Sequence, residues 1–206
     1  FKPEVRYEKG TTVPHQKHFN QYGAVCTDCH SSDKHKAVTI TPQGCQACHH
    51  RATNDKCTTC HAAQAGLYAA TLETALPVKK EPNVMAGKVD CVGCHDLTKK
   101  HSVARQAEKC TECHDKGYKD MLIMWQGQVG DAENAAKAAL GKAAAGVAEA
   151  RKARREVTPA ADLLAKARKD FDVVVKAKGL HNPDLAEAIL TESKQAAERA
   201  LARVTK

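Results

Sequence analysis

Residues 26–61 read CTDCHSSDKHKAVTITPQGCQACHHRATNDKCTTCH and contain the pentapeptide Cys-x-x-Cys-His three times. Two further copies follow, and the five copies together use all 10 cysteines of the 206-residue chain. A disulfide framework does not repeat one spacing with a histidine always next, so these cysteines serve another purpose. The copies are Cys26-Cys29-His30, Cys45-Cys48-His49, Cys57-Cys60-His61, Cys91-Cys94-His95 and Cys110-Cys113-His114.

Cys-x-x-Cys-His is the attachment sequence of c-type haem. Its two thioethers fix the porphyrin vinyl groups, and the adjacent histidine binds the iron as proximal ligand. A zinc ribbon takes four ligands from two cysteine pairs and has no role for a fixed histidine, and a redox dithiol would not recur five times. The sequence therefore predicts five covalently bound haem c groups, with the proximal ligands His30, His49, His61, His95 and His114.

The composition indicates what fills the interior. Aromatic residues make up only 4% of the chain, and residues 1–118 lack apolar runs that could build an ordinary core. We therefore expect this part to pack around the haems, with much irregular coil and short helices at the attachment sequences. Expected divisions are a three-haem module at 1–70, a linker at 71–90, a two-haem module at 91–118 and a helical bundle at 119–206.

The last part of the chain has a different character. Alanine accounts for 22 of the 88 residues from 119 to 206, and cysteine is absent from them. We expect helices over 131–157, over 160–179 and over 184–204, with Thr158 and Asn182 as caps for the second and third. Short connections predict an antiparallel bundle, so the expected fold is mainly α. A further short helix is expected within 62–76.

Six histidines remain after the five proximal ones, which nearly matches the five distal ligands that bis-histidine irons need. His15 and His18 in VPHQKHF are three residues apart, so one side of a turn carries both. The first and second attachment sequences are separated by 14 residues, and so are the fourth and fifth. His35 lies five residues after His30 and His101 six residues after His95, so the two intervals carry a histidine at nearly the same place. We expect the distal ligands to be His15, His18, His35, His101 and His181, with His50 a possible ligand and the expected spare one. The alternative is that His181 is a plain flank of a helix and the unused histidine. Met85, Met121 and Met124 are expected to pack and not to ligate.

The His-x-x-His pair ahead of the first attachment sequence resembles the class III multihaem cytochromes, over about residues 11–61. The resemblance implies a small electron-transfer protein in which one of His15 and His18 binds the first haem and the other binds a later one. In that family a histidine directly follows an attachment site, which corresponds here to His50, although at the second site and not the first. The segment His181-Asn182-Pro183 is similar to the helical region of cytochromes related to pentahaem nitrite reductases, which implies a ligand supplied by the bundle.

We expect an electron carrier and not an enzyme, because bis-histidine irons have no open coordination site. Two alternatives remain: a reductase of a small anion such as nitrite or sulfite with one open haem, and a subunit of a polymeric cytochrome wire. The catalytic haem of the nitrite reductases uses lysine in place of the proximal histidine, whereas all five sequences here end in histidine.

Haem attachment to this sequence takes place outside the cytoplasmic membrane in prokaryotes, so we expect a periplasmic or extracellular protein whose signal peptide has been removed. No run approaches the roughly 20 apolar residues of a transmembrane helix. No basic patch interleaved with aromatic residues indicates nucleic-acid binding. Expected partners are a quinol-side donor and a terminal reductase or outer-surface acceptor, as in anaerobic respiration. Membership of a membrane-associated redox complex or a homo-oligomer is also open.

Overall fold

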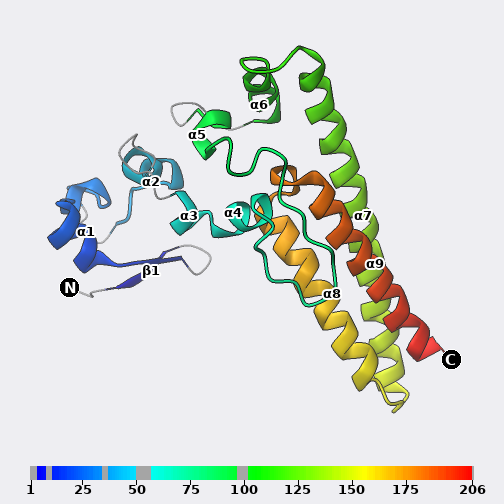
Figure 1. The fold of residues 1–206 in the computed structure, drawn as a ribbon. Coiled ribbons are helices and arrows are strands. Elements are labelled where there is room, and N and C mark those ends of the chain that lie inside the picture. The colour runs from blue at the N-terminus through cyan, green and yellow to red at the C-terminus, as the bar shows by residue number, and fades with distance from the viewer. Residues whose placement is uncertain (1–3, 8–10, 34–36, 50–56, 97–101, 206) are drawn as a thin grey trace. The chain divides into compact units, whose positions relative to one another are not determined.

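The computed structural model describes residues 4–7, 11–33, 37–49, 57–96 and 102–205 (Figure 1). These residues are mainly helical, joined by coil, as the sequence predicted. The chain forms two compact units, Phe1–Asn54 and Asp55–Lys206. The expected division at residues 70, 90 and 118 was defined by which haems each part binds, so it stays a prediction.

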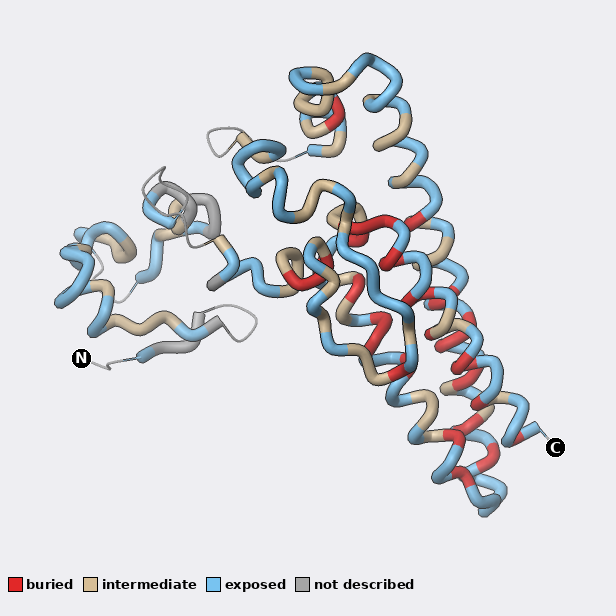
Figure 2. Tube along the Cα trace, viewed as in Figure 1, coloured by how far each residue is buried: buried red, intermediate tan, exposed pale blue. Residues whose placement is uncertain are grey.

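The first unit consists of short elements around two attachment sequences. Strands β1 (Val5–Tyr7) and β2 (Thr11–Val13) pair antiparallel. Three helical segments follow: α1 (His15–Tyr22), the 3-10 turn η2 (Cys26–Asp28) and α2 (Pro42–His49). Among the residues of this unit whose burial is described, none is buried (Figure 2). The described protein atoms therefore do not form a core of their own here.

The second unit begins with the remaining three attachment sequences. Helices α3 (Cys57–Cys60) and α4 (Ala62–Tyr68) come first, and an extended segment leads to α5 (Cys91–Cys94) and α6 (Val103–Cys110). The Ser102 hydroxyl caps α6 by accepting the Arg105 N–H at 3.3 Å. The helix expected within 62–76 is thus confirmed in its first half, and the rest of that stretch is coil.

Three long helices complete this unit: α7 (Gly117–Lys152), α8 (Thr158–Ala177) and α9 (Pro183–Thr205), with the 3-10 turn η3 (Gly179–His181) before α9. Their inward faces hold most of the buried residues (Figure 2). Many of these are alanines, which allow close approach of the helices. A β-carbon built on Gly146 of α7 would meet the Leu201 side chain of α9.

Two buried polar side chains fasten the extended segment to the helices. Asp170 of α8 is fully buried, and its carboxylate accepts the N–H groups of Ala75 at 2.6 Å and Leu76 at 2.8 Å. Asn182, at 3% exposure, donates to the carbonyls of Leu67 at 3.2 Å and Glu81 at 2.9 Å. These bonds satisfy backbone groups of the buried residues Leu67 and Leu76, and also of the less buried Ala75 and Glu81.

The helix boundaries differ from the expected ones at both ends of α7 and at the start of α8. Helix α7 ends at Lys152 and not at residue 157, because the backbone of Arg154 turns into the left-handed region with a φ of 57°. Helix α7 begins at Gly117 and not at residue 131, because no proline or cap interrupts the residues between. Thr158 does not cap α8: it is the first helical residue, and its N–H donates to the Glu156 carboxylate at 2.6 Å. Hydrogen bonds from the side chain and the N–H of Thr158 lower the pKa of Glu156. The Asn182 cap is confirmed, since its Oδ1 accepts the Leu185 N–H at 3.2 Å.

Replacing Asp170 by alanine should destabilise the second unit strongly, because the buried N–H of Leu76 and the half-buried N–H of Ala75 lose their acceptor. We expect the Asp170→Ala substitution to lower the free energy of unfolding by about 3 kcal/mol. Chemical denaturation followed by far-ultraviolet circular dichroism measures this change. Asp172→Ala, two residues along on the exposed side of α8, is the control and should change it by less than about 0.5 kcal/mol. Equal effects of the two substitutions would contradict the assigned role of Asp170.

A pair of glycine substitutions tests the packing of the turn before α9. A β-carbon on Gly179 would lie 2.5 Å from Cγ1 of Val129 and 3.1 Å from Cβ of Ala186, so Gly179→Ala should cost about 1–3 kcal/mol. A β-carbon on Gly141, which is exposed within α7, meets nothing within 4 Å. Gly141→Ala should therefore stabilise the protein by about 0.5–1 kcal/mol. Thermal unfolding of both variants measures the two opposite signs, and a stabilising Gly179→Ala would refute the close packing.

Candidate haem-binding sites

Each attachment sequence forms one helical turn. In four of the five, the histidine N–H donates to the carbonyl of the first cysteine at 2.9 Å, four residues back. The fifth, Cys45 to His49, lies at the end of α2. A single turn brings two cysteines three residues apart to one side and places the histidine directly after them. The four bonds run from His30 to Cys26, His61 to Cys57, His95 to Cys91 and His114 to Cys110.

All 10 cysteines are free thiols, which is what thioether formation requires. In the first unit, burial raises the pKa of the Cys29 thiol, and the neighbouring thiols of Cys45 and Cys48 raise it further. The first two attachment sequences are therefore close enough for their sulfur atoms to act on each other.

The same closeness links the three attachment sequences of the second unit. Burial raises the pKa of the Cys91 thiol, with a further contribution from Cys57. Burial likewise raises the pKa of Cys94, helped by Cys110 and Cys113. The attachment sequence at Cys91 thus adjoins both of the others. Tyr68 also borders this attachment sequence. Burial and the thiols of Cys94 and Cys91 raise the pKa of Tyr68, and its hydroxyl donates to the Val89 carbonyl at 3.0 Å.

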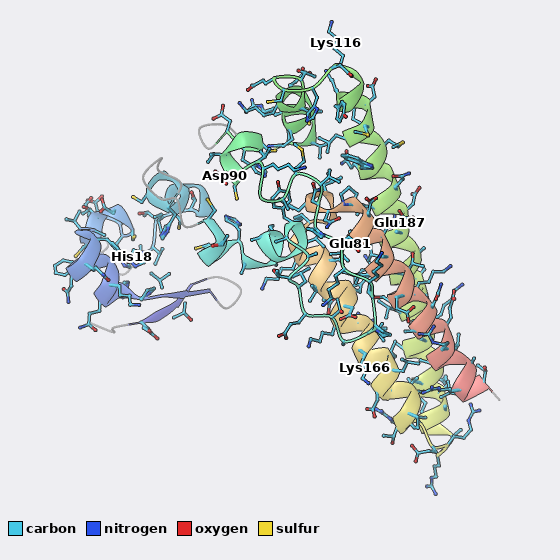
Figure 3. All side chains as sticks on the ribbon, in the orientation of Figure 1. His18, Glu81, Asp90, Lys116, Lys166 and Glu187 are labelled. Atoms are coloured by element: carbon cyan, nitrogen blue, oxygen red, sulfur yellow. The ribbon has the colours of Figure 1, made fainter. Side chains whose placement is uncertain are left out.

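Helix α1 brings its two histidines to the histidines of two different attachment sequences. The ring centres of His15 and His30 are 6.1 Å apart, and those of His18 and His49 are 5.8 Å apart. Nδ1 of His18, labelled in Figure 3, lies 3.0 Å from the Pro14 carbonyl oxygen. This contact is suited to an Nδ1–H donor, which leaves Nε2 with its lone pair.

A third pair of this kind occurs in the second unit. The ring centres of His95, after α5, and His181, in η3, are 6.0 Å apart. The Nδ1 atom of His181 lies 3.0 Å and 2.9 Å from the carbonyl oxygens of Ala177 and Lys178. The Gln106 amide contacts the other ring of the pair, with its Nε2 at 3.4 Å from Nδ1 of His95.

The other histidines and the methionines are the remaining candidate ligands. His114 stacks on Tyr118 with ring centres 4.2 Å apart, and His61 is exposed at the end of α3. His35, His50 and His101 lie outside the described residues. Of the methionines, Met124 is 52% exposed and Met121 and Met85 are half-buried, so their expected packing role stays a prediction.

The described residues fit c-type haem. Two imidazoles on opposite sides of one iron have ring centres about 6 Å apart, given about 2 Å for a metal–nitrogen bond and about 1.1 Å from nitrogen to ring centre. The three histidine pairs match this separation. A haem needs only two axial ligands from the protein, and the described residues contain no cluster of three or more potential ligands for another metal ion. Exposed apolar side chains near the attachment sequences offer a surface for porphyrin: Phe19, Tyr22, Val25, Val38 and Val92.

Sequence reasoning did not find Gln106, Tyr68 or the carbonyls at the end of α8. A glutamine in an amphipathic helix and a tyrosine near a linker carry no distinguishing pattern. Gln106 precedes Cys110 by one helical turn, and its carbonyl accepts the Cys110 thiol at 3.3 Å. That spacing is the one signal that could have pointed to it.

Comparison with known proteins gives one family match. The sequence model of the class III cytochrome c family matches residues 33–114, which contain four of the five attachment sequences. No curated protein and no solved structure matches the chain. Among the described residues, no helix is both long and apolar enough to span a bilayer. Together with the recurrent attachment turns, the family match supports a multihaem c-type cytochrome.

Proposed function

We propose that the chain is a pentahaem c-type cytochrome that transfers electrons between redox partners and catalyses no reaction of its own. The observation that carries this proposal is the occurrence of histidine pairs whose ring centres are 5.8–6.1 Å apart. An iron held by two imidazoles has no position left for a substrate. It changes oxidation state without making or breaking substrate bonds.

The haems are numbered 1 to 5 in the order of their attachment sequences. In the first unit, the ring separations favour His15 as the distal ligand of haem 1, opposite His30. They favour His18 for haem 2, opposite His49. The distal ligands of the remaining haems are proposed to be His35, His101 and His181, with His50 spare.

Close spacing of the haems supports rapid transfer from one to the next. Because the thiols of Cys57 and Cys91 are neighbours, the attached edges of haems 3 and 4 should adjoin. The neighbouring thiols of Cys94 and Cys110 favour the same relation between haems 4 and 5. Haem 4 is then the middle member of a row of three.

The proposed location is the periplasm or the cell exterior, because proteins with covalently attached haem c are typically exported. The proposed partners are a quinol-side donor and a terminal reductase or outer-surface acceptor. Haem propionates offset part of the formal charge of +8, so the protein is not expected to present a strongly basic surface.

The oxidised protein should contain five haems per chain, all low-spin. The pyridine assay gives the haem count, and low-temperature electron paramagnetic resonance gives the spin states. Dithionite should reduce all five haems, and nitrite or sulfite should not reoxidise them catalytically. A high-spin signal that shifts on addition of nitrite or sulfite would favour the reductase and contradict the carrier.

Removing a distal ligand should open one iron without losing its haem. We expect His18→Gly to retain five haems and to convert one of them to high spin, since the thioethers and His49 remain. Added imidazole should restore the low-spin state. Lys17→Ala, exposed on the same helix, is the control and should keep the wild-type spectrum. An unchanged spectrum for His18→Gly would exclude His18 as a ligand.

A further inference from the structure

We propose that His181 is the distal ligand of haem 4, opposite His95, so that the helical bundle is itself part of a haem site. This inference rests on the proposed function, because it assumes a haem attached at Cys91 and Cys94. It assigns the partner of one iron and gives the bundle a role in redox chemistry. A bundle with only a structural role would supply no iron ligand.

The separation of the two rings is the first argument. Their centres are 6.0 Å apart, between the values of 6.1 Å and 5.8 Å for the two pairs in the first unit. The two pairs that involve α1 and the pair that involves η3 thus share one separation, and it is the separation that an intervening iron requires. By contrast, the centres of His114 and Tyr118 stack at 4.2 Å, which leaves no room for a metal between them.

The protonation of His181 is the second argument. Its Nδ1 lies 3.0 Å from the Ala177 carbonyl oxygen and 2.9 Å from that of Lys178. Both neighbours are acceptors, so the contacts suit an Nδ1–H donor, and in the neutral ring this tautomer has its lone pair on Nε2. Histidines that bind metals through one nitrogen commonly donate from the other to a backbone carbonyl in this way.

The rigidity of the turn that carries His181 is the third argument. Gly179 packs closely against Val129 of α7 and Ala186 of α9: a β-carbon would collide with Val129 and make a tight contact with Ala186. The His181 carbonyl accepts the Asn83 side-chain amide at 3.1 Å. The next residue is the buried cap Asn182. A ligand held this firmly costs little further ordering when it binds iron.

The Gln106 amide supports the opposite ligand. As placed, its Nε2 is 3.4 Å from Nδ1 of His95. A half-turn of the amide exchanges oxygen and nitrogen with almost no change in shape. Oε1 then accepts the Nδ1–H that an iron-bound His95 carries. Gln106 of α6 thus orients the ring of His95, and the Ala177 and Lys178 carbonyls at the end of α8 orient the ring of His181.

The His181→Gly variant of the full, haem-loaded chain tests the assignment. We expect five haems by the pyridine assay and one of the five converted from low to high spin, with imidazole restoring the low-spin state. The matched control is Gln64→Ala, which removes a 3.0 Å hydrogen bond to the Lys176 carbonyl near the same end of α8 but touches neither ring. It should keep the wild-type spectrum. High-spin iron in the control would attribute the effect to loosened packing and overturn the proposal.

A double variant identifies which iron His181 serves. If His95 and His181 share haem 4, adding His181→Gly to a His95→Gly chain should not increase the number of high-spin haems, whether that chain retains haem 4 or loses it. An increase of one would assign His181 to another iron and overturn the pairing. Should the wild-type protein itself show open high-spin iron, the proposed carrier function fails. A fully low-spin wild type with an unchanged His181→Gly spectrum rejects this inference alone.

Discussion

The second unit depends on one buried amide. Asn182 caps α9 with its oxygen and donates from its nitrogen to two carbonyls, at Leu67 and at Glu81. One side chain therefore joins a helix, a short helix near an attachment sequence and the extended segment between attachment sequences. Because the residue before it is His181, the same junction sets where that imidazole lies. Asp170 likewise binds two backbone groups of this segment, the N–H groups of Ala75 and Leu76. The coil of residues 70–90 therefore has a defined path despite its lack of regular structure.

The two units solve the shortage of apolar side chains differently. The second unit has a protein core of small residues, in which alanines of α7, α8 and α9 pack closely. The first unit has no buried residue among those whose burial is described, and Phe19 and Tyr22 are 55% and 69% exposed. Apolar groups left in water are unfavourable, so this unit is expected to gain most of its stability from the haems it binds.

The sequence alone predicted much of this arrangement, and the successes share a physical basis. Five copies of a strict motif identify the attachment turns, and the Asn-Pro pair identifies the cap of α9, because both patterns are local. The start of α7 was missed because residues 117–130 contain neither a stop signal nor a regular apolar stripe. The Thr158 cap was wrong because α8 starts one residue earlier than expected. Thr158 is its first helical residue and donates its own N–H to the Glu156 carboxylate, and the Ala160 and Ala161 N–H groups donate to the Val157 carbonyl.

The unpredicted features are all contacts between distant segments. Asp170 and the N–H groups it holds are about 95 residues apart in sequence, and no local pattern marks a buried carboxylate. Likewise, the sequence offered six histidines without pairing them. His15 with His30, His18 with His49 and His95 with His181 emerge only when the chain is folded.

The continuity of α7 has a consequence for where electrons can leave the second unit. At 1.5 Å per residue, its 36 residues extend about 54 Å, from just after His114 to Lys152. That span contains no attachment sequence. Under the proposed function, electrons therefore enter or leave near the His114 end of α7, whereas its Lys152 end only packs against α8 and α9.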